Sequence, residues 1–383
     1  MQSRTRTGPL TGLRVVELAG IGPGPFAAML LADLGADVVR IERPDGSGSS
    51  LPPESDILRR NRRSVVIDLR APEGVRAALG LVEHADVLIE GYRPGVTERL
   101  GLGPDECWER NPRLVYGRMT GWGQEGPLAA AAGHDISYIA ITGALGAIGR
   151  QGERPAVPLN LVGDFGGGSL YLALGILSAV FEAGRSGRGQ VVDAAIVDGA
   201  ASLTTLMHSM LGAGLWRDER GVNMLDTGMP WYDVYETSDG GWMAVGALEP
   251  KFYAEFVALL GIETTEHDRK NPATWAELRE KIAAAFAERT REEWSKIFEG
   301  TDACVAPALG FSEATRHPHL RARNTFLEVD GITQPAPAPR FSRTPAAIPQ
   351  PPVRPGAHTR QTLLEWGVSD ADALIESGVA VQS

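Results

Sequence analysis

The chain has 383 residues, of which 43% are hydrophobic and 22% charged, a composition typical of a globular protein long enough for two domains. The net charge of −11 argues against general binding to nucleic acid or membrane, so an anionic ligand needs a local arginine cluster. With only Cys107 and Cys304, the chain lacks the cysteines for a disulfide framework or a cysteine-rich metal site, which favours a reducing cytoplasmic location. Residues 1–7 do not read as a signal peptide, and no apolar run reaches transmembrane length.

Apolar strand patterns alternate with helix patterns through the first half of the chain. Helices are predicted over residues 26–34 and 72–83. Because each helix joins two strands, the pattern indicates βαβ units and an α/β fold with a doubly wound parallel sheet. The predicted strands are 13–18, 37–42, 64–69, 85–90, 114–119 and 190–196.

The second half has a different composition. Apolar helices are predicted over 136–148, 170–182 and 197–215, followed by a hairpin and three amphipathic helices between 232 and 298. Eight prolines between 335 and 355 indicate an extended connector. We therefore predict a discontinuous large domain and a small α+β domain. The bounds are 1–195 and 335–383 for the large domain, 196–231 for a linker helix region, 232–317 for the small domain and 318–334 for a return linker.

A glycine- and proline-rich loop, residues 20–25, joins the first strand to the first helix, and Glu42 ends the second strand where a dinucleotide fold places a ribose-binding acid. The glycine spacing is not that of the NAD fingerprint, and Pro23 and Pro25 lack the N–H groups that would face a pyrophosphate. A tight strand-to-helix turn is favoured over NAD binding.

Arginines concentrate in the N-terminal half despite the acidic net charge. The planar guanidinium suits phosphate because it donates two parallel hydrogen bonds. Any one of these arginines is best read as a solvated loop charge, but as a set they favour a polyphosphate ligand, either a nucleotide or coenzyme A. The set is Arg40, Arg43, Arg59, Arg60, Arg62, Arg63, Arg70, Arg93 and Arg99.

Two helix N-termini carry titratable residues. His134 and Asp135 precede the helix predicted from 136, where Asp135 is a natural N-cap and the helix dipole keeps His134 neutral and able to act as a base. Asp164 precedes three glycines, which allow either close approach to a ligand or close helix packing. Two such groups flanking one carbon atom suit proton transfer between its faces. Asn160 is a candidate donor to a carbonyl oxygen, and Glu249 a candidate partner for an imidazole.

Several long motifs carry a resemblance to a known family. Residues 10–19, 32–44 and 61–69 resemble the opening of the class III CoA-transferase family. Within that family the chain is most similar to the α-methylacyl-CoA racemases, through residues 91–100, 119–124, 133–135 and 160–168. The resemblance implies an isomerase that inverts C2 of 2-methylacyl-CoA thioesters by two-base proton transfer through an enolate. It implies that the reaction needs no metal and no redox cofactor. CoA is part of the substrate and is not a separate cofactor.

The resemblance also implies roles for individual residues. His134 and Asp164 are the implied catalytic bases, supported by Glu249 and Asn160. The family fold has a large Rossmann-like domain and a small domain, and two subunits interlock as a homodimer. The alternative is a CoA-transferase that uses Asp135 as its nucleophile, so His134 is the residue that favours the racemase. The implied CoA-binding residues are Arg43, Ile67, Asp68, Leu69, Arg70, Gly91, Tyr92, Arg93, Arg99, Gly133, His134, Asp135, Ile136, Ser137 and Tyr138.

Overall fold

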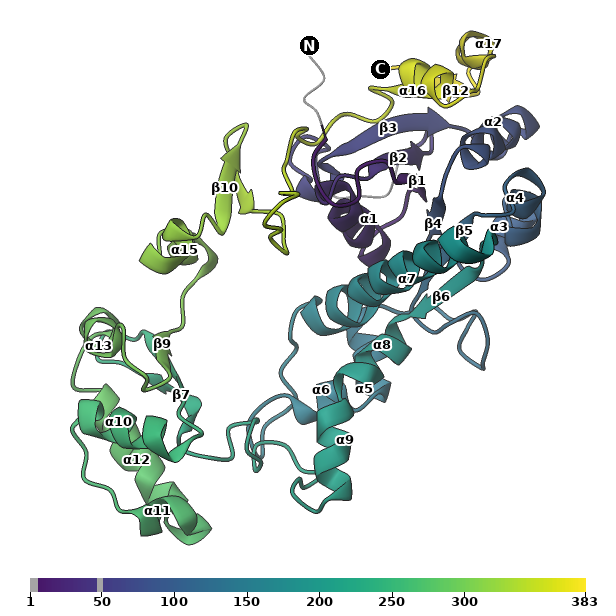
Figure 1. Cartoon of the computed structure of the whole chain (residues 1–383). Coiled ribbons are helices and arrows are strands. Elements are labelled where there is room, and N and C mark those ends of the chain that lie inside the picture. The colour runs from purple at the N-terminus through teal and green to yellow at the C-terminus, as the bar shows by residue number, and fades with distance from the viewer. Residues whose placement is uncertain (1–5, 47–50) are drawn as a thin grey trace. The chain divides into compact units, whose positions relative to one another are not determined.

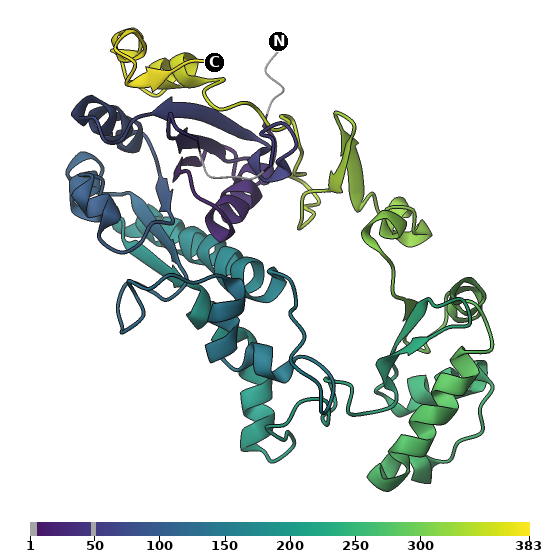
Figure 2. The same cartoon turned by 180° about the vertical axis from the view of Figure 1, so that it is seen from behind.

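The computed structural model describes residues 6–46 and 51–383, so the segment 1–5 of the predicted polar N-terminus lies outside the described residues. The described chain forms two compact units (Figures 1 and 2). Unit 1 falls within Met1–Thr142, Leu159–Leu203 and Asn324–Ser383, and unit 2 comprises Gly143–Pro158 and Thr204–Arg323.

The bounds of the two units differ from those of the predicted domains and linkers. Residues 143–158 belong to unit 2, because Arg150 pairs with Asp233 at 2.7 Å and Arg220 donates to the Gly146 carbonyl at 2.7 Å. The predicted linker helix region 196–231 is divided at Leu203. The predicted return linker 318–334 is divided at Arg323.

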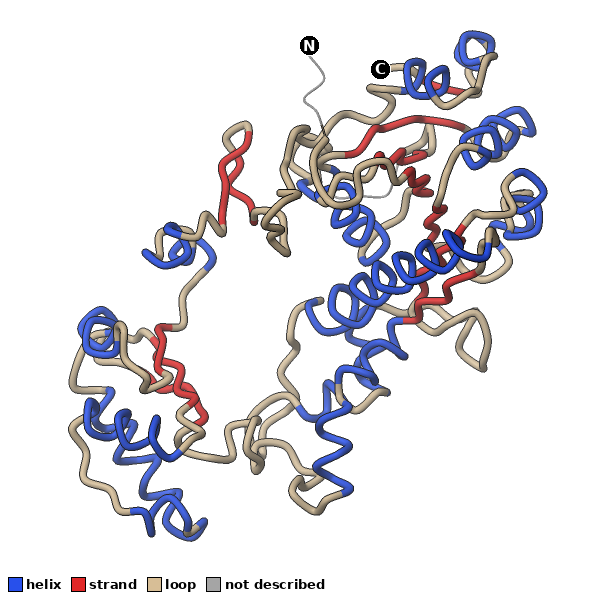
Figure 3. The backbone as a smooth tube through the Cα atoms, viewed as in Figure 1, coloured by secondary structure: helices blue, strands red, loops and turns tan. Residues whose placement is uncertain are grey.

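Unit 1 contains a seven-stranded sheet in the order β12-β3-β2-β1-β4-β5-β6, shown as red segments in Figure 3. Neighbouring strands are parallel except for β12 and β3. The order 3-2-1-4-5-6 is that of a Rossmann-like fold, with its switch point between β1 and β4, and the predicted doubly wound α/β class is confirmed. The strands are Arg14–Leu18, Asp37–Glu42, Arg62–Ile67, Val87–Glu90, Val115–Thr120, Val191–Ala195 and, for β12, Ala380–Val381.

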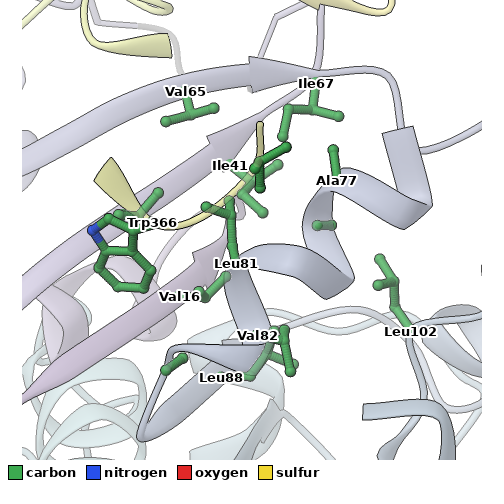
Figure 4. Close-up of a cluster of buried hydrophobic side chains, with 14 of the residues drawn as sticks. Val16, Ile41, Val65, Ile67, Ala77, Leu81, Val82, Leu88, Leu102 and Trp366 are labelled. Atoms are coloured by element: carbon green, nitrogen blue, oxygen red, sulfur yellow. The ribbon is translucent and has the colours of Figure 1, made fainter. Parts of the chain in front are cut away.

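Two hydrophobic cores cover the two faces of this sheet. Val16 on one face packs in a cluster with Leu81 and Trp366 (Figure 4), whereas Val15 on the other face packs in a cluster with Leu31. Since both faces are covered, neighbouring strand residues such as Val15 and Val16 are both apolar, which gives the strands short apolar runs instead of a strict alternation. The covering helices are α1 (Pro23–Asp33), α2 (Pro72–Glu83), α3 (Val96–Arg99), α4 (Pro104–Arg110), α7 (Leu170–Ser186), α16 (Thr359–Glu365) and α17 (Ala371–Glu376).

Two of the predicted helices are divided in the structure. The helix predicted over 136–148 is α5 (Asp135–Ile141), which ends before Gly143 (φ +84°), and the short α6 (Ala144–Ala147) follows in unit 2. The N-cap of α5 is His134, not the predicted Asp135. The helix predicted over 197–215 is divided into α8 (Ile196–Leu203) and α9 (Thr205–Gly212).

A π-helix, η2 (Leu161–Ser169), leads directly into α7. Together they form a helix of 26 residues that is long and apolar enough, by length and composition alone, to cross a membrane, which corrects the expectation that no segment reaches that length. Gly167 of η2 crosses α8 closely, since a Cβ on Gly199 would lie 1.8 Å from the Gly167 carbonyl oxygen. The glycines after Asp164 therefore serve close helix packing, one of the two predicted roles.

Unit 2 combines a three-stranded sheet, in the order β7-β8-β9, with helices around a core that includes Phe256, Phe286 and Trp294. The strands β7 (Tyr232–Glu236) and β8 (Trp242–Gly246) form the predicted hairpin. Its other elements are α10 (Pro250–Leu260), α11 (Glu266–Lys270), η3 (Pro272–Thr274), α12 (Trp275–Phe286), α13 (Arg291–Phe298), β9 (Val305–Pro307), α14 (Phe311–Ala314) and α15 (Pro318–Ala322). In unit 1, η1 (Ile57–Arg59) and the hairpin β10 (Phe326–Val329) with β11 (Ile332–Pro335) complete the description.

Candidate active site

A pocket of about 430 Å³ lies in unit 1 at the carboxyl ends of β1, β4 and β5. Residues 20–25, which comprise the end of the β1–α1 loop and the first turn of α1, form one wall, at the topological switch point where ligands bind in open α/β sheets. Leu18, Ile21, Met119 and Ile196 give the pocket an apolar part. His134 and Asp164, far apart in the sequence, both line it.

His134 is exposed and stands directly before α5 in an extended backbone conformation (φ −136°, ψ 170°). Its carbonyl oxygen accepts the Ser137 N–H at 2.7 Å, whereas its side chain makes no capping hydrogen bond. The main chain of His134 therefore begins the helix, and the imidazole is left to the pocket. An imidazole at such a place is suited to proton transfer.

Asp164 lies in η2 and is half-buried, and its carboxyl group faces Gly22 at the start of α1, since a Cβ on Gly22 would lie 3.3 Å from Asp164 Oδ2. Burial is the main cause that raises the pKa of Asp164 to about 6, and the nearby charge of Asp135 acts in the same direction. A hydrogen bond from Asn160 and the proximity of His134 act in the opposite direction. A carboxyl group with this pKa exchanges protons readily near neutral pH.

Asp135 is the first residue of α5 and is buried. Its Oδ1 accepts the main-chain N–H of Asp164 at 2.6 Å, and the residue is absent from the pocket lining. Asp135 thus lies behind the pocket wall, and His134 before it lies in the wall.

Two acids in the pocket wall were not singled out in the sequence as site residues. Glu90, the last residue of β4, is 2% exposed, and burial raises its pKa to about 7 despite the N–H of Tyr92 on its Oε2 at 2.7 Å. Glu17, in β1, also lines the pocket and is paired with Arg40 and Arg62. Both could have been found in the sequence, because each is an acid near the carboxyl end of a predicted apolar strand, and the two strands flank the switch point.

The structure corrects the predicted polyphosphate role for five of the nine arginines, because these five are buried or half-buried and paired with acids: Arg40, Arg59, Arg60, Arg62 and Arg63. Arg59 is buried with both terminal nitrogens on Glu42, at 2.7 and 2.6 Å, and Arg62 is buried against Glu17. Arg60 is buried against Asp33, and the half-buried Arg63 pairs with Asp37 at 3.1 Å. Since a buried guanidinium must be paired, these arginines stabilise the fold and are not free for a ligand.

The remaining predicted residues divide between the pocket wall and other places. Asn160 precedes η2 beside Asp164, and Glu249 is exposed in unit 2, where it precedes α10. Arg43 and Arg70 are exposed and approach Asp45 and Asp68. Of the predicted CoA-binding residues, the pocket wall contains Gly91, Tyr92, Arg93, Gly133, His134 and Tyr138, and it does not contain Arg43, Ile67, Asp68, Leu69, Arg70, Arg99, Asp135, Ile136 and Ser137.

Known proteins resemble this chain along nearly its whole length. It is 47% identical over 370 residues to a Mus musculus protein named alpha-methylacyl-CoA racemase, covering 95% of each chain. It is 45% identical over 379 residues to a Homo sapiens protein of the same name, covering 96% and 98%. The crystal structure of a CAIB/BAIF family protein from Brucella suis matches with a TM-score of 0.82 and 25% identity, covering 94% and 100%. The family model described as CoA-transferase family III matches residues 10–359, and the chain belongs to that family.

Proposed function

We propose that this protein is an isomerase that inverts C2 of 2-methylacyl-CoA thioesters. The observation that carries the proposal is the meeting of His134 and Asp164 in the wall of one pocket. The identity of 47% and 45% to two proteins named alpha-methylacyl-CoA racemase supports the same reaction.

In the proposed mechanism the thioester acidifies the C2 proton, and two groups exchange it from opposite faces. Neutral His134 removes the proton in one direction while protonated Asp164 returns one, and the reverse direction exchanges these roles. The pair therefore holds one proton in total before and after the transfer. The pKa of Asp164, about 6, leaves both of its protonation states accessible near neutral pH. Asn160, hydrogen-bonded to Asp164, supports that carboxylate.

A CoA-transferase reaction is the alternative within the family, and it requires Asp135 as a nucleophile. The position of Asp135 favours the racemase. The carboxylate is buried, it accepts the Asp164 N–H, and it is absent from the pocket wall. A nucleophile must reach the thioester carbon, which lies on the pocket side of that wall in the proposed complex.

The CoA part of the substrate is proposed to bind along Gly91, Tyr92 and Arg93, which line the pocket. Arg93 and the exposed Arg43, Arg70 and Arg99 supply cations for the phosphates. The enolate oxygen is proposed to be stabilised by the main-chain N–H groups of Asp135 and Ile136, because the first N–H groups of a helix have no acceptor within it. The reaction needs no metal or redox cofactor, and the two free cysteines agree with a cytoplasmic location.

The outer face of α7 supports a homodimer. Leu170, Leu174 and Phe181 are 53%, 62% and 69% exposed, and they recur at helical spacing along one face. An uncovered apolar row of this kind is typical of an interface, and we assign a second copy of the chain to it. Sedimentation equilibrium tests the assignment. A dimer that Leu174→Glu weakens supports it, and a monomeric wild-type protein contradicts it.

The racemase proposal is tested with one enantiomer of a 2-methylacyl-CoA in D₂O, without an acceptor acid. We expect incorporation of deuterium at C2 and conversion of the single enantiomer into a mixture of both. Mass spectrometry measures the deuterium, and chiral separation measures the enantiomer ratio. Absence of exchange, with CoA transfer once a free carboxylic acid is added, would instead support the transferase.

A further inference from the structure

Asp135 makes an unusual contact for an acid in the first turn of a helix. Its side chain turns away from its own helix and reaches the adjacent segment η2, where Oδ1 lies 2.6 Å from the main-chain nitrogen of Asp164. The contact is tight, because a Cβ on Gly163 would lie 2.3 Å from the same oxygen. Only glycine at position 163 leaves room for this carboxylate against the main chain.

The segment that Asp135 holds is irregular. Each hydrogen bond of a π-helix spans one residue more than that of an α-helix, and these rare helices are found frequently at functional sites. Here Phe165 donates its N–H to the Asn160 carbonyl at 3.2 Å, which widens the turn that carries Asp164. Ser169 holds the other side of the peptide, since its Oγ lies 3.0 Å from the Asp164 carbonyl oxygen and 2.8 Å from that of Pro23. The main chain of Asp164 is therefore held at its N–H and at its C=O.

We propose that Asp135 is a positioning residue for the racemase reaction, whose buried carboxylate fixes the Asp164 main chain so that the Asp164 carboxyl group faces the pocket. The inference rests on the proposed function, and it gives a role to an aspartate that does not line the pocket. It also explains why a buried carboxylate is kept there. Oδ2 of Asp135 is buried without a hydrogen-bond partner among the described residues, a cost that is compensated if the charge serves the reaction.

The charge of Asp135 has an effect that is separate from its hydrogen bond. The groups around the Asp164 carboxyl are Asp135, His134, Asn160 and Tyr138, and among them Asp135 is the neighbour whose charge raises the pKa of Asp164. Removal of that charge favours the ionised carboxylate and lowers the pKa. The acid limb of the pH profile of kcat/KM then moves to lower pH.

Two substitutions separate the hydrogen bond from the charge. Asp135→Asn keeps an oxygen acceptor and loses the charge, whereas Asp135→Ala loses both. We expect kcat to fall about 10- to 100-fold in the alanine variant, the loss typical of a misplaced catalytic group, with KM within about twofold of wild type. The asparagine variant should keep most of the kcat that the alanine variant loses. In both variants the acid limb lies at lower pH.

Ser169→Ala is the matched control, because it removes the other anchor of the Asp164 main chain without changing any charge. We expect it to lower kcat and leave the acid limb in place. C2 deuterium exchange measured from pH 5 to 9 gives all of these values, and thermal unfolding reports whether each variant is folded. If Asp135→Ala does not fold, the pH profile of Asp135→Asn decides.

The inference is overturned if folded Asp135→Asn keeps the acid limb of the wild-type protein. It is also overturned if Asp135→Asn loses as much kcat as the alanine variant. Both outcomes presuppose a wild-type protein that exchanges the C2 proton. A wild-type protein without exchange contradicts the proposed function itself, so the two failures are distinguishable.

Discussion

Unit 1 contains two regions of buried charge that differ in pairing. In the ion-pair network, defined as Glu17, Arg40, Glu42, Arg59 and Arg62, guanidinium groups are matched with carboxylates across β1, β2 and β3. Among the described residues, Glu90 and Asp164 in the pocket wall have no such close, matched cations, since the guanidinium of Arg118 lies 3.9 Å from Glu90. The pKa values of Glu90 and Asp164 are raised to about 7 and about 6, burial being the main cause.

The comparison shows that a buried carboxyl group can stabilise the fold or take part in acid–base chemistry, depending on whether a cation is paired with it. A paired buried charge is held in one ionisation state, so it contributes order and cannot exchange protons near neutral pH. A buried acid without a matched cation titrates near neutral pH, which is the property that acid–base catalysis needs. The comparison makes opposite predictions for substitutions in the two regions.

The largest effect on activity is expected from Asp164→Asn. Loss of one base should lower the rate of racemisation about 10²- to 10⁴-fold, the contribution typical of general acid–base catalysis. The fold should tolerate the change, since a neutral amide replaces a partly buried acid. Chiral analysis of the product measures the rate, and circular dichroism checks the fold. Undiminished racemisation would remove Asp164 from the mechanism.

Glu42→Gln tests the other region. Arg59 and Arg40 lose the carboxylate that they share, and breaking a buried pair from one side costs about 3–5 kcal/mol. Urea unfolding should show a loss of that order, whereas racemisation in the folded variant should stay near that of wild type, because Glu42 does not line the pocket. A variant of unchanged stability would contradict the structural role of the network.

Glu90→Gln is expected to have a smaller effect, visible in the pH dependence of stability. The folded-state pKa of Glu90 is about 7 and the ordinary value is 4.5, so the folded protein binds this proton more tightly. Stability is therefore lost as pH rises from about 4.5 to about 7, by roughly 1–3 kcal/mol. The glutamine variant should show a smaller decline in unfolding free energy between pH 5 and pH 8. Parallel curves for the two proteins would contradict the raised pKa.

The smallest effect is expected from chelation. The proposed chemistry at the pocket is proton transfer alone, so dialysis against EDTA should leave the rate of C2 exchange unchanged within error. A loss of exchange that returns when a divalent cation is added would contradict the proposal that no metal is required.

Much of the fold was predictable because the strands of the parallel sheet are buried on both faces. Val15 and Val16 serve opposite cores, so a simple apolar run marks the strand. The pairing of Arg59 with Glu42 was not predictable, since the two residues lie on different elements 17 residues apart and nothing local marks them as partners. The arginine-rich segment 59–63 therefore resembled a phosphate-binding site in the sequence.

The candidate site shows the same limit. The motifs identified His134 and Asp164 as candidates, and the structure brings both to one pocket. The contact between the Asp135 side chain and the Asp164 main chain depends on how closely η2 approaches α5. A helix-capping pattern in the sequence carries no information about that approach. The π-helix was also missed, because the sequence from Leu161 to Ser169 predicts only an apolar, glycine-rich approach to a helix.

The most direct test of the two-base mechanism measures C2 exchange of each enantiomer separately in His134→Gln and in Asp164→Asn. If the two groups serve opposite faces of C2, each variant should still exchange one enantiomer without inverting it, and the enantiomer should differ between the two variants. Exchange of the same enantiomer by both variants, or continued inversion by either one, would contradict the mechanism.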